Sequence, residues 1–321
     1  MDFNNLFEHL GEHTVNGLTK GSIYGLVALG YTLVYGVLQL INFAHSEVFM
    51  VGTWTVLGVY TVIGADEESG ALMVFAALAI ALVAAATASA STALVIERIA
   101  YRPLRRRKAP RLIFLLTAIG FSLALMEVFG FVLRKFFGPP FGRATVTIPE
   151  LVQHKALFTI AGVTVTNIQL VIIVSALVMM VVLDTFINRT RMGRGVRAVA
   201  QDPDTAALMG VNKNRVFMLI FVVGGAMAGM AALLFTMRFS ITKFDIGFLL
   251  GLKAFTAAVL GGIGNLRGAL LGGLLLGVVE VYSSSLFSSN WEDVTAFVVL
   301  VVVLMFRPTG ILGESLGKAR A

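Results

Sequence analysis

The chain of 321 residues is 57% apolar and only 13% charged, whereas soluble domains contain about 45–50% apolar and about 25% charged residues. It has no cysteine, which excludes disulfides and thiolate metal ligands. Its net charge is +7, and the basic residues gather in a few short polar segments between apolar runs. This composition excludes a soluble enzyme or a nucleic-acid-binding domain and predicts an all-α polytopic membrane protein.

Nine apolar runs follow one another along the chain, and a helix of about 20 apolar residues spans a bilayer. The second run is short and rich in glycine and threonine, so it is either a full span or a re-entrant, broken segment. The sequence therefore predicts a transmembrane helix bundle of eight to nine spans. The runs are roughly 21–41, 46–64, 71–96, 112–133, 167–187, 216–237, 248–264, 269–287 and 292–306.

The first two runs meet at a polar junction that contains Asn42, His45 and Glu47. A broken helix at this junction would expose polar groups to a cavity. These three residues, with Ser22 and Tyr24 of the first run, are therefore candidates for a substrate pathway. The alternative is an ordinary polar turn in which His45 and Glu47 cap the second helix. Composition alone supports this turn at least as well.

The distribution of lysine and arginine predicts the orientation of the bundle. If residues 98–111 are cytoplasmic and nine crossings alternate, 17 of the 25 basic residues lie inside, together with the loop 188–215 and the C-terminus. The acidic residues 66–68 and 292–293 then lie outside. The N-terminus is outside if the second run spans the membrane and inside if that run is re-entrant.

Glu127 and Glu280 are single carboxylates within the fourth and eighth runs. Ionisable groups inside a span are costly and often functional. Each of these two either carries protons or bonds to a neighbouring helix. Because no basic residue lies in register with either one, the sequence favours the second alternative.

The loop 188–215 contains a short helix with well-marked ends. Asp202 suits the N-cap, Pro203 the first helical position and Gly210 the C-terminal stop. No lipid covers the apolar face that begins at Ala206. This helix either rests on the membrane surface or docks into a groove of a cytoplasmic partner.

A nucleotide-binding loop is missing from the sequence. The nearest match, residues 313–318, has three residues instead of four between its glycines, and Ala319 stands where a hydroxyl must bind magnesium. The sequence therefore predicts neither a metal site nor a cofactor. Any ATP must be hydrolysed by another polypeptide.

Three blocks of sequence, in order, resemble the permeases of branched-chain amino acid ABC transporters of the LivH kind. They are residues 16–45, which end in Ile-Asn-Phe-Ala-His, residues 197–211, and the glycine-rich residues 251–273. The resemblance implies one permease domain over residues 1–321, with a cytoplasmic coupling segment at about 188–215. In that segment it assigns contact with an ATPase to Arg197, Gln201, Asp202, Ala206 and Gly210.

The resemblance also implies a role in import through the bacterial inner membrane. The chain would carry branched-chain or hydrophobic amino acids and would itself be no enzyme. Its partners would be a second, related permease in a heterodimer, two cytoplasmic ATPases and a periplasmic binding protein. Two features depart from the family: Ser46 stands where glycine is usual, and the basic cluster 105–108 is pronounced. Alternatives that stay open are a permease for urea or short amides, a proton-coupled secondary transporter that uses Glu127 or Glu280, and a membrane scaffold.

Overall fold

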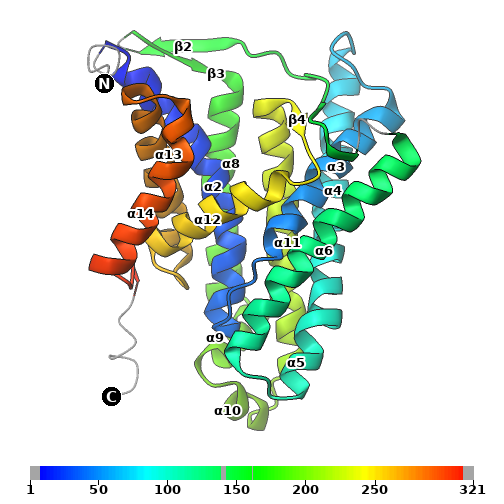
Figure 1. The fold of residues 1–321 in the computed structure, drawn as a ribbon, viewed down its shortest axis with the longest axis vertical. Coiled ribbons are helices and arrows are strands. Elements are labelled where there is room, and N and C mark those ends of the chain that lie inside the picture. Colours follow the sequence, from blue (N-terminus) through cyan, green and yellow to red (C-terminus); the bar gives the residue numbers. More distant parts are fainter. Residues whose placement is uncertain (1–7, 139–141, 161, 314–321) are drawn as a thin grey trace. The chain divides into compact units, whose positions relative to one another are not determined.

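The computed structural model describes residues 8–138, 142–160 and 162–313 (Figure 1). Eight of the described helices are long and apolar enough to cross a membrane. The predicted polytopic helix bundle is therefore confirmed. The chain divides into two compact units. The terminal unit comprises the described residues of 1–36, 154–189 and 252–321, and the central unit those of 37–153 and 190–251.

The terminal unit is built around two helices that pack through glycine, α2 and α13. A Cβ atom added at Gly21 or Gly277 would lie closer than 3.0 Å to backbone atoms of the facing helix. Small residues allow the two backbones to approach this closely. In lipid, where the hydrophobic effect does not bring helices together, the van der Waals contacts of this close packing do so. The unit contains α2 (Leu10–Leu38), β2 (Ala156–Ile160), β3 (Val163–Thr166), α8 (Asn167–Arg189), most of α12 (Ile246–Gly261), α13 (Leu266–Leu286), η2 (Ser289–Trp291) and α14 (Glu292–Phe306).

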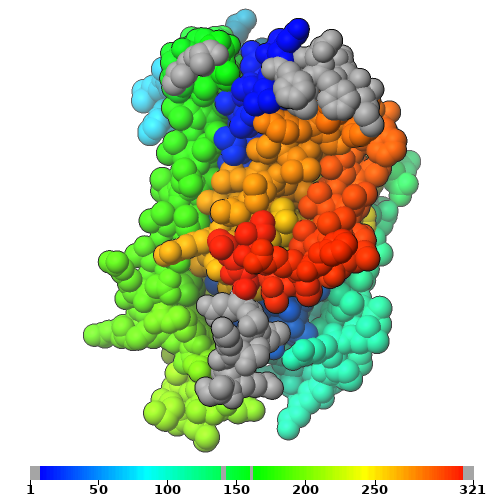
Figure 2. Space-filling model, turned by 90° about the vertical axis from the view of Figure 1, so that its left-hand side faces the viewer, coloured from blue at the N-terminus to red at the C-terminus, as the bar shows by residue number. Residues whose placement is uncertain are grey.

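The outer face of the terminal unit is apolar where α13 and α14 lie side by side (Figure 2). Val298, Val301 and Met305 of α14 are all more than half exposed. In water such a surface would be unfavourable, and in a bilayer it contacts acyl chains. Such exposed apolar residues are typical of the outer surface of a membrane-spanning helix.

The central unit packs α11 against α4 and α3 through small residues. A Cβ added at Gly225 would lie 2.7 Å from the Cβ of Ala93, and one added at Gly52 would lie 2.7 Å from the Cβ of Ala232. The unit contains α3 (His45–Ile63), α4 (Ala71–Ile96), the π-helical turn η1 (Glu97–Tyr101), α5 (Arg102–Arg106), α6 (Arg111–Phe137), β1 (Val146–Thr147), α9 (Arg191–Gln201), α10 (Pro203–Leu208), α11 (Lys213–Phe239) and β4 (Ile241–Thr242), which pairs antiparallel with β1.

The start of the first span and the place of the short helix differ from those expected, whereas the second run has the expected bounds. The first span begins at Leu10 and not near residue 21, because polar groups of its first turns bond within the unit: Asn16 accepts from Gln169 at 2.9 Å. The second run forms a helix of 19 residues. Among the described apolar helices, the one too short to be a candidate span is α12, with 16 residues, which ends where Gly262 and Gly264 adopt φ of 107° and 102°.

Candidate functional site

The polar junction lies at the start of α3 in the central unit, where Asn42, His45 and Glu47 are each at most 2% exposed. Residues 39–44 are not helical, and the N-cap residue Ala44 makes no side-chain cap. The side chain of Glu47 does not cap the helix either, because it bonds to side-chain hydroxyl groups. The junction is therefore a buried polar cluster and not an exposed turn.

Glu47 has one carboxylate oxygen engaged and one unengaged. Its Oε1 accepts hydrogen bonds from Ser122 of α6 at 3.0 Å and from Ser46 at 3.2 Å. Its Oε2 is buried and has no hydrogen-bond partner among the described residues. A Cβ added at Gly247 would meet both this Oε2, at 3.2 Å, and the backbone of Ser46. The site thus presents an acceptor to a cation or a proton, and it keeps a glycine beside that acceptor.

Asn42 presents the complementary group, a donor. The hydroxyl of Tyr101 donates to Asn42 Oδ1 at 3.2 Å and lies 3.3 Å from the carbonyl oxygen of Ile41. The ring of Tyr101 is fixed between Phe114 and Phe221 at centroid distances of 5.8 and 5.2 Å. Asn42 Nδ2 is buried without a partner in the described part of the chain. Asn42 is therefore held with its amide N–H groups unused.

Tyr101 and Ser122 are members of this cluster that the sequence alone did not reveal. They follow Asn42 and Glu47 by 59 and 75 residues in the chain. Tyr101 stands in the π-helical turn, and such turns occur frequently at functional sites. No local motif marks either residue.

Ser22 and Tyr24, the other two predicted pathway residues, belong to the terminal unit, whereas Asn42, His45 and Glu47 belong to the central unit. The hydroxyl of Ser22 donates to the carbonyl oxygen of Leu18 at 2.7 Å. Tyr24 is buried, with the Nζ of Lys253 5.9 Å from its ring centroid. That all five residues line one pathway stays a prediction.

Glu280 lies in a buried network of charges that joins four helices of the terminal unit. It is fully buried on α13, and its Oε1 bonds to Lys253 of α12 and lies 3.5 Å from the Nζ of Lys20 on α2. Lys20 also pairs with Glu292, and Lys253 pairs with Asp293 at 2.6 Å. Glu280 therefore bonds to neighbouring helices, as the sequence favoured. Its basic partners come from parts of the chain where no sequence pattern pointed to them.

Glu127 differs from Glu280 in its exposure. Its side chain is 59% exposed and pairs with the Nη2 of Arg143 at 3.2 Å. This carboxylate is therefore paired at an exposed position and not buried, and its two predicted roles, carrying protons or bonding to a neighbouring helix, both stay predictions.

The short helix expected in the basic loop is confirmed as α10. Asp202 caps it by accepting from the backbone N–H groups of Asp204 at 2.9 Å and Thr205 at 3.1 Å. The Thr205 hydroxyl also donates to Asp202 at 2.6 Å. This hydrogen bond, followed by the two backbone hydrogen bonds, holds the pKa of Asp202 below its ordinary value. Gly210 ends the helix with φ of +85°. Of the other predicted coupling residues, Ala206 lies on α10 and is buried, whereas Arg197 and Gln201 lie on α9.

The apolar tip of this loop is formed by Leu208 and Met209, which are 87% and 82% exposed. The sequence predicted that Ala206, Leu208 and Met209 form one apolar face of the short helix. Ala206 instead turns inward, at 5% exposure, so only the last two residues project.

The two basic segments of the central unit lie at the same end of that unit. The guanidinium of Arg105 lies over the ring of Phe217, near the start of α11, at 4.2 Å. The acidic residues 66–68 precede α4, whereas Arg105 follows it, so the two are separated by the length of that helix (Figure 1). This arrangement agrees with the separation of basic and acidic loops that the charge distribution predicts.

Comparison with known proteins identifies the family. The family model described as branched-chain amino acid transport system, permease component, matches residues 13–304. The high-affinity branched-chain amino acid transport system permease protein BraD of Pseudomonas aeruginosa is 43% identical over 95% of this chain and 96% of its own length. The corresponding protein LivH of Escherichia coli K12 is 41% identical over 96% and 97%. A probable LivH of Methanocaldococcus jannaschii is 24% identical over 98% and 97%. On this evidence of sequence and fold, the chain belongs to the branched-chain amino acid transport permease family.

Proposed function

We propose that the protein is the membrane-embedded permease subunit of an ABC importer for branched-chain amino acids in the bacterial inner membrane. The observation that carries this proposal is the identity of 41–43% over nearly the whole chain to two permeases of that transport system. The subunit works with a second, related permease, two cytoplasmic ATPases and a periplasmic binding protein. It has no enzymatic activity of its own.

The substrate pathway runs past the polar cluster at the start of α3. An amino acid carries an ammonium and a carboxylate, which need an acceptor and a donor. Glu47 Oε2 is a buried acceptor without a partner among the described residues, and Asn42 Nδ2 is a donor in the same state. Together with His45, Ser22 and Tyr24, these groups form the proposed pathway.

The orientation with the N-terminus outside is supported by contacts within the terminal unit. Thr14, near the start of α2, is 2.7 Å from the Tyr282 hydroxyl near the end of α13. At the opposite end of α13, Arg267 pairs with Asp184 at 3.0 Å. If the basic residue Arg267 is cytoplasmic, the first turns of α2 lie at the outer surface.

The test of the proposed function is uptake by vesicles that contain the full assembly. Labelled leucine should accumulate only when ATP, the ATPases and the binding protein are all present, because this chain has no nucleotide-binding loop. Labelled urea should not accumulate. Leucine uptake that needs only a proton gradient would contradict the proposal and support a secondary transporter, and ATP-driven urea uptake would identify an amide permease.

In the same assay, Glu47→Gln should lower leucine uptake roughly 10- to 100-fold, since a hydrogen bond to a charged group contributes about 1.5–3 kcal/mol. The matched control is Glu127→Gln, which removes an exposed carboxylate from the same unit. Uptake that is normal in Glu47→Gln, or equally low in both variants, would contradict a pathway role for Glu47.

The α9–α10 segment is the proposed coupling element, in which the exposed Leu208 and Met209 insert into a groove of the ATPase. The shape of this element depends on Gly210, whose φ of +85° suits glycine. Gly210→Val should therefore abolish stimulation of ATP hydrolysis by substrate, because a left-handed conformation costs a side-chain-bearing residue about 1–2 kcal/mol and turns the tip aside.

The control for this coupling variant is Gly64→Val. Gly64 also has a positive φ, of 71°, and also has open space around it, but it follows α3 at the opposite end of the central unit. Substrate should still stimulate ATP hydrolysis in the Gly64→Val variant. If substrate stimulates ATP hydrolysis equally in Gly210→Val and Gly64→Val, α10 is not the coupling element.

A further inference from the structure

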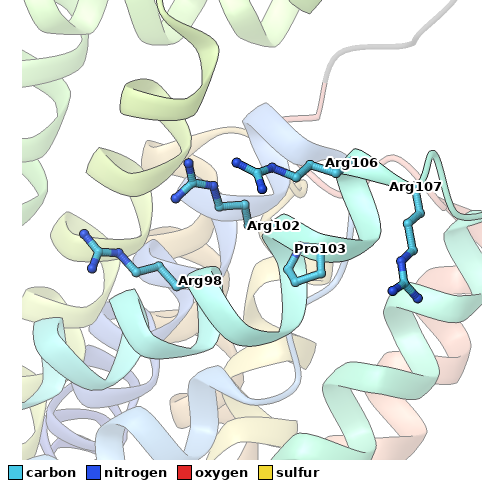
Figure 3. Close-up of a pocket in the computed structure, with 5 residues that line it drawn as sticks. All are labelled: Arg98, Arg102, Pro103, Arg106 and Arg107. Atoms are coloured by element: carbon cyan, nitrogen blue, oxygen red, sulfur yellow. The ribbon is translucent and has the colours of Figure 1, made fainter.

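A cavity of about 410 Å³ lies at the basic end of the continuous helix formed by α4, η1 and α5. It is lined by Arg98, Arg102, Pro103, Arg106 and Arg107. Figure 3 shows Arg98, Arg102 and Arg106 extending from one side of the helix, with Arg107 beyond Pro103. Residues four apart share a helix face. Three guanidinium groups, those of Arg98, Arg102 and Arg106, therefore share one face of the helix at this cavity.

The positive charge of this cavity is not neutralised by the described part of the chain. None of its four arginines forms an ion pair with a described carboxylate. The nearby Glu97 is buried and bonded to Arg105, which lies over Phe217 instead of lining the cavity. The Nε of Arg102 is buried without a hydrogen-bond partner among the described residues. The cavity is thus suited to an anion.

The helix that carries the cavity also has exposed apolar side chains in the turns between Val95 and Arg102. Val95 and Ile99 are 46% and 63% exposed. The helix from Ala71 to Arg106 is one of the candidate spans, so its last turns reach the membrane surface. A ligand with an anionic group for the arginines and a hydrocarbon part for the exposed apolar side chains of the same helix suits this position.

We propose that this cavity binds the phosphate headgroup of an anionic phospholipid. Arginine recognises phosphate through paired, charge-assisted hydrogen bonds, and basic pockets at the ends of spans bind such headgroups. Soluble phosphate offers the same chemistry to the arginines but would leave the exposed Val95 and Ile99 of the same helix without a contact. The exposed apolar side chains favour the lipid.

The test is native mass spectrometry of the full chain in detergent with added phosphatidylglycerol or phosphatidylcholine. The chain should retain phosphatidylglycerol and not phosphatidylcholine. The triple variant Arg98→Gln, Arg102→Gln, Arg106→Gln should bind phosphatidylglycerol on the order of a hundredfold more weakly, from the contribution of each arginine near a membrane surface. Val95→Ser with Ile99→Ser should weaken lipid binding and leave the binding of inorganic phosphate unchanged.

The control removes three exposed arginines elsewhere in the central unit, by Arg191→Gln, Arg194→Gln and Arg215→Gln. This variant should keep its lipid, and both triple variants should unfold at the same temperature as the parent. Equal loss of lipid in both would mean unspecific attraction and overturn the proposal. Inorganic phosphate that displaces the lipid at equal concentration would assign the cavity to a soluble anion. A cavity variant that keeps its lipid but no longer binds the ATPases would assign it to a protein surface.

Discussion

Gly277→Ala is expected to prevent the terminal unit from folding stably, although it adds only one methyl group. The added Cβ would lie closer than 3.0 Å to backbone atoms of both Gly17 and Gly21, and backbone cannot move aside as a flexible side chain can. Overpacking of this kind costs about 3 kcal/mol, and in lipid no hydrophobic force draws the separated helices together again. Thermal unfolding of the purified chain, and its yield as a single species, measure the effect.

The matched control is Gly58→Ala in α3, because a Cβ at Gly58 meets nothing within 4 Å. Alanine also has the higher helix propensity, so this variant should be as stable as the parent or slightly more stable. If Gly277→Ala unfolds at the same temperature as Gly58→Ala, the close contact between α2 and α13 is not a determinant of stability.

Lys253→Met is expected to destabilise the terminal unit by about 3 kcal/mol. The substitution keeps the length of the side chain but removes the cation that bonds to the buried Glu280. Lys20, 3.5 Å away, then remains as the nearest cation. Removing one member of a buried pair leaves the other charge poorly compensated, here by Lys20 alone, whereas removing both members does not. The double variant Lys253→Met, Glu280→Leu should therefore unfold at a higher temperature than Lys253→Met.

The exposed pair Glu127–Arg143 provides the comparison for this cycle, since its side chains are 59% and 75% exposed. Arg143→Gln should change the free energy of unfolding by about 0.5 kcal/mol or less, as is usual for surface pairs. A double variant at 253 and 280 that is less stable than Lys253→Met would argue that Glu280 serves contacts other than this ion pair. A Lys253→Met effect as small as that of Arg143→Gln would show that the buried network contributes little.

The features predictable from the sequence are those set by residues close together in the chain. Apolar runs of about 20 residues place the spans, because a backbone in lipid must satisfy its own hydrogen bonds. The ends of α10 follow from Asp202 and Gly210, since a cap acts on N–H groups two or three residues away. The three sequence blocks that resemble branched-chain permeases likewise led to the correct family.

The tertiary structure decided which polar groups meet across helices. Glu280 pairs with Lys20 and Lys253. Glu47 accepts a hydrogen bond from Ser122, and Asn42 accepts one from Tyr101. Composition shows that a buried carboxylate needs a partner, but the partner depends on how neighbouring helices are rotated and how closely they approach. Glycine contacts between backbones set that rotation and approach, as Gly21 and Gly277 do for α2 and α13. The short helix in the bundle was likewise α12 and not the second run, because the chain turns at Gly262 and Gly264.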